Sequence, residues 1–103
     1  MASPRYLCSE LVELRCAGTS LIVNLEEIWE SGAILEAEES SPTGVHADLR
    51  CGAITLSGRL TQAENHALGW RLEMEFSPLT PWSPELFRPE HLLDPSKLSE
   101  PRP

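Results

Sequence analysis

Apolar and polar residues alternate in steps of two along most of this sequence, and this alternation restricts the fold more than any other feature. It is the pattern of a β-strand with one buried face. Turn-forming stretches such as AGTS, ESG, SSPTG, CG and AENH separate the alternating segments. Six short strands joined by such turns predict an all-β fold, an antiparallel barrel or sandwich. The alternating segments are 6–16, 20–28, 33–39, 45–51, 53–60 and 66–76.

The last alternating segment carries the heaviest apolar stripe. Its even positions share one face, which predicts a place in the core rather than in a cofactor site. The stretch TQAEN just before it is typical of a bulge or of a hairpin tip. The face holds Leu68, Trp70, Leu72, Met74 and Phe76, and the stripe expected in the core is Trp70, Met74 and Phe76.

The last quarter of the chain follows a different pattern, because seven of the nine prolines come after residue 77. Proline removes a backbone donor and fixes φ, so no central strand is expected there. Ser83 is a candidate N-cap with Pro84 at the first helical position, which predicts a short C-terminal helical segment. We expect it to pack apolar side chains against one end of the barrel and residues 94–103 to form a flexible tail. These side chains are Trp82, Leu86, Phe87, Leu92 and Leu93.

Length and charge limit the class of protein. A chain of 103 residues with 41% hydrophobic residues suits one small domain, here 5–93. No apolar run is long enough to span a bilayer and no signal peptide is recognisable, so we expect a cytoplasmic protein. The net charge is -8 and the basic residues are scattered. That pattern argues against DNA or RNA as a partner and against an anionic membrane.

The cysteines and histidines are candidates for a metal site. Cys8 and Cys16 share a strand face but lie about 26 Å apart along it, so they cannot bind one ion. No closely spaced pair of ligands occurs elsewhere, and free cysteines are common in protein cores. We therefore expect no metal and no cofactor. The six residues are Cys8, Cys16, Cys51, His46, His66 and His91.

The sequence also has no motif that indicates an enzyme. His66 follows Glu64 and His46 precedes Asp48, but neither pair has a nucleophile motif around it. We expect no catalytic residues.

The stretch NLEEIWESGAIL, residues 24–35, is the least ordinary part of the chain. Glu26, Glu27 and Glu30 form either a partner-binding patch or a solvated strand end. Trp29 either fills a vacated pocket, anchors an interface or packs as an ordinary aromatic residue. Trp29 and Ile28 cannot both face inward on a regular strand.

The sequence over 25–60 resembles a PilZ domain, and the resemblance extends over most of 5–93. PilZ sequences are similar in having a strand that ends in D/N-x-S-x-x-G, a P-x-G before the fourth strand, and then a strand that carries a glycine. The resemblance implies a six-stranded antiparallel β-barrel with a short C-terminal helical segment. It also implies a cyclic di-GMP receptor or adaptor in a bacterial cytoplasm. The matching positions are Gly32, Pro42, Gly44 and Gly58.

The resemblance also implies where a ligand would bind. With Gly32 as the family glycine, Glu27 takes the D/N position and Trp29 takes the serine position. Trp29 puts a bulky indole where a small hydroxyl would contact cyclic di-GMP, and a polar site tolerates such a loss poorly.

The family's R-x-x-x-R motif before the first strand is incomplete in this chain. Arg5 can stand for one member, but its partner position is Met1 or Ser9, and Arg15 lies too deep in the first strand. The glycine expected in the final strand is replaced by Glu73.

Three hypotheses follow. The leading one is a non-catalytic regulatory or protein-interaction module with degraded cyclic di-GMP motifs, which meets a protein partner through its acidic face and the Trp29 region. The alternative keeps cyclic di-GMP as the ligand, in a variant site made of Arg5, Glu27 and the backbone near Gly32. The third is a β-barrel unrelated to PilZ domains that serves as a subunit of a larger assembly.

Overall fold

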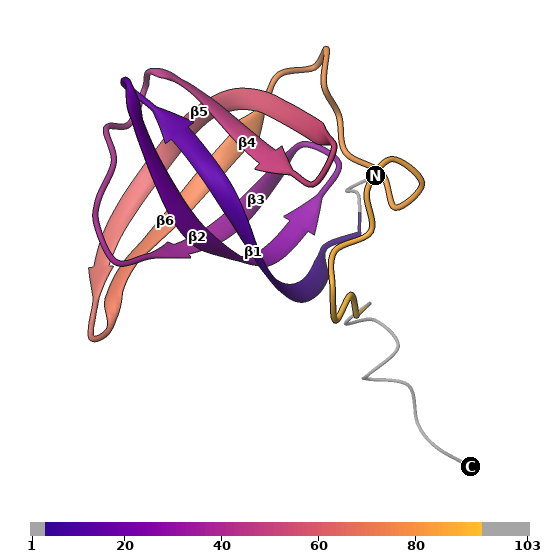
Figure 1. The fold of residues 1–103 in the computed structure, drawn as a ribbon, viewed down its shortest axis with the longest axis horizontal. Coiled ribbons are helices and arrows are strands. Elements are labelled where there is room, and N and C mark those ends of the chain that lie inside the picture. The colour runs from indigo at the N-terminus through magenta and orange to yellow at the C-terminus, as the bar shows by residue number, and fades with distance from the viewer. Residues whose placement is uncertain (1–3, 94–103) are drawn as a thin grey trace.

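A computed structural model describes residues 4–93 of the chain (Figure 1). Within them six antiparallel strands close into a barrel in the order β1-β2-β3-β6-β5-β4. The predicted all-β barrel is therefore confirmed. The strands are β1 Tyr6–Cys16, β2 Thr19–Trp29, β3 Gly32–Ala37, β4 His46–Cys51, β5 Ile54–His66 and β6 Gly69–Phe76.

The barrel interior is made by the inward-facing residues that the alternation predicts. Leu14, Leu49 and Met74 are fully buried, and Leu14 pairs with Leu49 across β1 and β4. The core also takes in the buried cysteines Cys16 and Cys51. Outward-facing residues on the same strands are mostly polar, so each strand has one face toward solvent.

Tight turns set the register of two hairpins. The β1–β2 turn places both Ala17 (φ 52°) and Gly18 (φ 79°) in the left-handed region. Two such residues in succession give a turn whose twist matches the strands that it joins. The β4–β5 turn begins with one such residue, Gly52 (φ 62°).

The fifth strand is longer than predicted. It continues through TQAEN to His66, and the register shift between Leu60 and Gln62 marks a bulge rather than a hairpin tip. The tip lies at Ala67 and Leu68 instead. Leu68 is consequently 88% exposed, although the alternation places it on the same face as the buried Leu72 and Met74.

The predicted C-terminal helical segment is not observed, since residues 77–93 contain turns, irregular backbone and one bridge residue, Leu93, but no helix. Ser83 does begin one turn, since its carbonyl accepts hydrogen bonds from the backbone N–H groups of Leu86 and Phe87. Pro89 prevents the turn from continuing, because the residue before a proline is driven out of helical geometry.

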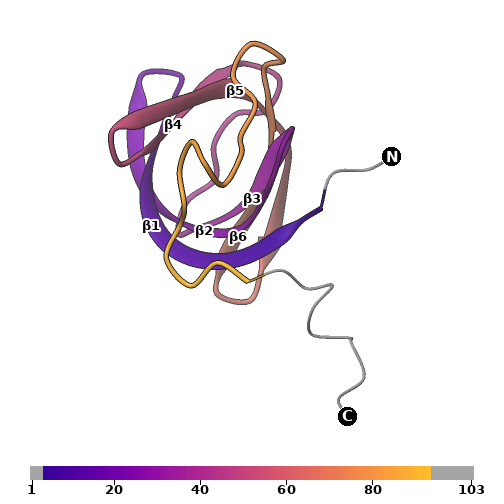
Figure 2. The same ribbon diagram turned by 90° about the vertical axis from the view of Figure 1, so that its right-hand side faces the viewer.

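This segment closes one end of the barrel, as Figure 2 shows. Trp82 is 3% exposed, its indole N–H donates to the Phe87 carbonyl at 2.8 Å, and Tyr6 meets it edge-on at 5.5 Å between ring centroids. Phe87 and Leu92 pack on the core as expected, whereas Leu86 and Leu93 are exposed.

The end of the described chain also pairs with the start of β1. Leu7 and Leu93 exchange two backbone hydrogen bonds of 2.8 and 2.7 Å. The Ser9 N–H donates to the Glu90 carbonyl, and the Glu90 N–H donates to Oε1 of Glu10. These bonds cover the part of β1 that β4 does not reach. The tail predicted at 94–103 lies outside the described residues.

None of the residues described forms a helix that is long and apolar enough to cross a membrane.

Candidate functional site

Trp29 lies on the outer face of the barrel at the end of β2. Ile28 faces the interior and is fully buried, so the next residue must point outward. Trp29 is nevertheless only 8% exposed, and Ile34, which also points outward from β3, is 3% exposed. Neither belongs to the interior core cluster. Both are therefore apolar side chains that are covered although they lie on the outside of the sheet.

Gly32 lets the indole lie close to the sheet. It pairs with Trp29 across the β2–β3 hairpin and with Glu75 of β6. A Cβ at position 32 would lie 2.8 Å from Cζ2 of Trp29 and 2.5 Å from the backbone oxygen of Met74. Both distances are far below van der Waals contact. The glycine therefore makes room for the tryptophan ring.

Arg5 stacks on the indole ring. Its guanidinium carbon is 3.9 Å from the centroid of the Trp29 ring, which is a cation–π stack. Beside the stack is a hollow of about 300 Å³. Its lining residues come from four parts of the chain: Arg5, Trp29, Ser31, Thr61, Glu73, Met74 and Glu75.

The walls of this hollow are acidic. Glu73 and Glu75 project outward from β6, two residues apart on the same face. Glu75 accepts from Arg59 at 3.4 Å, but both of these side chains are largely exposed, so the pair neutralises the wall only in part. An anionic ligand entering here would meet two carboxylates.

Glu27 belongs to a different cluster. The guanidinium of Arg71 on β6 donates to Oε2 of Glu27 at 3.4 Å. Glu27 does not line the hollow next to Trp29. Of the four residues that the resemblance assigns to the ligand site, the structure thus brings Arg5, Trp29 and Gly32 together and holds Glu27 apart.

Glu26 and Glu36 form a close carboxyl pair beside that cluster. Glu26 is the extra residue of a bulge in β2 opposite β3. Burial raises the pKa of Glu26 to about 7, and a hydrogen bond and charge repulsion from Glu36 add to the rise, while Arg71 and Asn24 oppose it. The pair can therefore hold a proton near neutral pH.

The motif analysis overlooked Thr61, Glu75, Glu36 and Arg71. Two of them could have been found from strand pairing, because Glu75 lies opposite Gly32 and Arg71 opposite Glu36 in the β3–β6 register. That register pairs strands far apart in sequence, so the alternation alone does not reveal it.

A second polar cluster joins His46, Asp48 and Ser57 on β4 and β5. The Ser57 hydroxyl donates to Oδ1 of Asp48 at 2.7 Å, and Nε2 of His46 lies 2.9 Å from the same oxygen. A nucleophile requires its base as a direct neighbour. Here the carboxylate stands between the serine and the imidazole, so His46 is not placed to deprotonate Ser57.

The thiols are suited to packing rather than to chemistry. Burial is the main cause that raises the pKa of Cys8 and of Cys51 to about 12, with the charge of Glu10 adding to both. All three cysteines are free. Across residues 4–93 no three His, Cys, Asp or Glu side chains gather closely enough to hold a metal ion.

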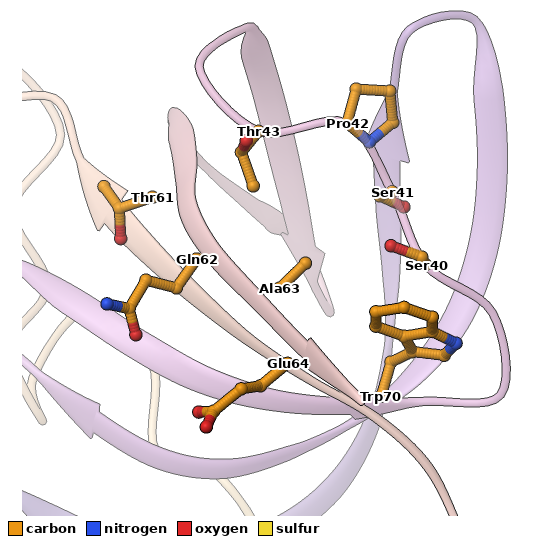
Figure 3. A pocket seen from close by; sticks show the side chains of 9 residues that line it. All are labelled: Ser40, Ser41, Pro42, Thr43, Thr61, Gln62, Ala63, Glu64 and Trp70. Carbon is orange, nitrogen blue, oxygen red and sulfur yellow. The ribbon is translucent and has the colours of Figure 1, made fainter. Parts of the chain in front are cut away.

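Another hollow, of about 700 Å³, lies between the β3–β4 connection and the bulged part of β5 (Figure 3). Trp70 stands below Ser40 and Ser41 in this view, and Glu64 is the only ionisable side chain in the lining. The surface is open and its polar groups do not converge, so it offers less for specific recognition than the Trp29 hollow.

The sequence matches no protein-family model, and no curated protein matches it either.

Proposed function

We propose that this chain is a non-catalytic regulatory or protein-interaction module, on a PilZ-like barrel, whose nucleotide site is filled by its own side chains. The observation that carries the proposal is the stack of Arg5 on Trp29 above Gly32. The resemblance implies a small hydroxyl that contacts the nucleotide at position 29 and an arginine that binds the nucleotide at position 5. In this chain the indole fills the space and engages the arginine.

Electrostatics support the same proposal. Cyclic di-GMP carries two phosphates, and Glu73 and Glu75 line the hollow that it would enter. Like charges in a partly buried site cost affinity unless cations pair with them. Arg59 is already engaged with Glu75. Arg5 alone would then have to bind the phosphates, and it would first have to leave the Trp29 ring.

The cyclic di-GMP receptor remains the alternative function, because Arg5 is exposed and lies at the edge of the hollow. Its variant site would use Arg5, Glu27 and the backbone near Gly32. The pairing of Glu27 with Arg71 weighs against it, since that carboxylate would have to exchange partners to reach the ligand.

We place the module in a reducing compartment such as a bacterial cytoplasm. The support is the set of three free cysteines, two of them buried. Disulfides form readily in oxidising compartments, and this chain uses its cysteines as core residues instead.

The test is titration calorimetry of the full chain with cyclic di-GMP at low salt, together with affinity capture from a bacterial lysate. The proposal expects no heat up to millimolar nucleotide and a captured protein that is lost with Trp29→Ala. Micromolar binding of cyclic di-GMP with no captured protein would overturn it in favour of the receptor.

A further inference from the structure

We propose that the hollow beside Trp29 is a guanidinium-binding site. Arg5 of the same chain (the cis arginine) occupies it until an arginine from a basic segment of a partner protein (the trans arginine) takes its place. This inference rests on the proposed function and names the chemistry of the partner.

The first step in the argument is what the site already binds. The guanidinium carbon of Arg5 lies 3.9 Å from the centroid of the Trp29 ring, so the site already binds a guanidinium group from its own chain. A planar, weakly hydrated cation over an aromatic face is the arrangement that favours arginine over lysine.

The second step is that Arg5 uses only part of the site. Within residues 4–93 its guanidinium makes no ion pair, although Glu73 and Glu75 line the same hollow. An arginine that approached from outside could stack on Trp29 and also reach these carboxylates. Charge-assisted contacts of that kind are the strong ones for arginine.

The third step concerns charge and rigidity. The chain has a net charge of -8, which attracts a basic segment and repels an acidic one. The indole and the carboxylates sit on paired strands, with Trp29 fixed against Gly32. Arg5 precedes β1, so it can leave without breaking any strand pairing.

Competition between the cis and the trans arginine gives a measurable effect. A molecule in which Arg5 stacks on Trp29 cannot bind the arginine of a partner, so only the fraction with a free Trp29 ring is competent to bind. Removing an exposed cation–π contact should make a trans arginine bind about threefold to fivefold more tightly, because the whole population becomes competent.

The experiment uses the full chain and a blocked peptide of three arginines spaced by glycines. Two matched peptides carry lysine or citrulline, and citrulline keeps the shape of arginine without its charge. Binding is followed at physiological salt through the Trp29 indole N–H signal in NMR, assigned with Trp29→Phe. At this ionic strength charge attraction over more than about 8 Å is screened.

We expect the arginine peptide to bind better than the lysine peptide and the citrulline peptide not to bind. Arg5→Ala should tighten binding about threefold to fivefold, whereas Arg15→Ala, a control at an exposed arginine paired with Glu13, should leave it unchanged. Glu73→Gln should weaken binding, and the control Glu85→Gln should not. Both glutamine variants keep the size of the side chain, so they test charge without disturbing the fold.

Equal binding of the citrulline peptide, no tightening in Arg5→Ala, or equal effects of Glu73→Gln and Glu85→Gln would each overturn the inference. Titrating cyclic di-GMP into the same samples separates the two proposals. Nucleotide binding would overturn the proposed function itself, while an absence of both kinds of binding would overturn the arginine site alone.

Discussion

Gly32→Ala is the substitution that tests the packing of the outer face most sharply. The new methyl group would lie 2.5 Å from the Met74 carbonyl oxygen, which is backbone and cannot move without shifting β6. Overpacking of this kind costs about 1–3 kcal/mol. The methyl would also lie 2.8 Å from Cζ2 of Trp29, so the ring must tilt outward. If the tilt exposes roughly a quarter of an indole side chain, about 50 Å², it costs a further ~1 kcal/mol.

The expected loss in the free energy of unfolding is therefore about 2–4 kcal/mol, which lowers the melting temperature by roughly 10–25 °C in a domain of this size. Urea unfolding followed by far-UV circular dichroism measures it. Gly18→Ala is the control, because position 18 has φ 79° and a Cβ added there would meet no heavy atom within 4 Å. Gly18→Ala should lower the free energy of unfolding only by the cost of a left-handed backbone at a residue with a Cβ, about 1–2 kcal/mol. In a Trp29→Ala background the cost of Gly32→Ala should fall, since one of its two contacts is gone. A Gly32→Ala protein with the stability of the wild type would refute this reasoning.

Three further predictions concern other parts of the barrel. Burial and Glu36 raise the pKa of Glu26 from 4.5 to about 7, so the native state holds a proton that the unfolded chain releases. The contribution of Glu26 to stability should be greatest below pH 4.5, fall as the pH rises toward 7 and level off above it; after allowance for solvent screening the fall is about 1 kcal/mol. Glu26→Gln should abolish this fall in urea midpoints taken from pH 5 to 8, and an unchanged fall would exclude Glu26 as its source. Iodoacetamide should label the native thiols far more slowly than the unfolded ones, because burial raises the pKa of Cys8 and of Cys51 to about 12; equal rates would contradict that burial. Trp82→Ala should cost about 3–5 kcal/mol in urea unfolding, since it opens the end of the barrel, and a loss below 1 kcal/mol would mean that residues 77–93 do not close it.

The barrel could be predicted because its signal is local. Inward positions such as Val12, Leu14 and Leu72 follow the period of two, and glycines with positive φ mark the turns at Gly18 and Gly52. The length of β5 escaped prediction because its bulged, solvated half has little apolar alternation. The C-terminal segment failed as a helix because a favourable cap at Ser83 does not offset the break at Pro89.

The candidate site could be predicted only in part. The resemblance to PilZ domains draws attention to Gly32 and Trp29, and strand parity predicts that Trp29 and Ile28 face opposite ways. The stack of Arg5 on Trp29 depends on the β1–β2 register, in which Tyr6 pairs with Ile28 beyond an irregularity between Leu7 and Glu10 that the alternation does not reveal. The acidic wall depends on the β3–β6 pairing between strands that are distant in the chain.

The contact between Arg5 and Trp29 is the central claim, because both proposals depend on it. The most direct test is proton NMR of the wild-type chain, which reports the ring-current shift of the Arg5 side-chain methylene protons. A stacked guanidinium places these protons over the indole, so the account predicts upfield shifts that vanish in Trp29→Ala and contacts in NOE spectra between the two side chains. Arg5 resonances at random-coil positions in the wild type, unchanged by Trp29→Ala, would contradict the account.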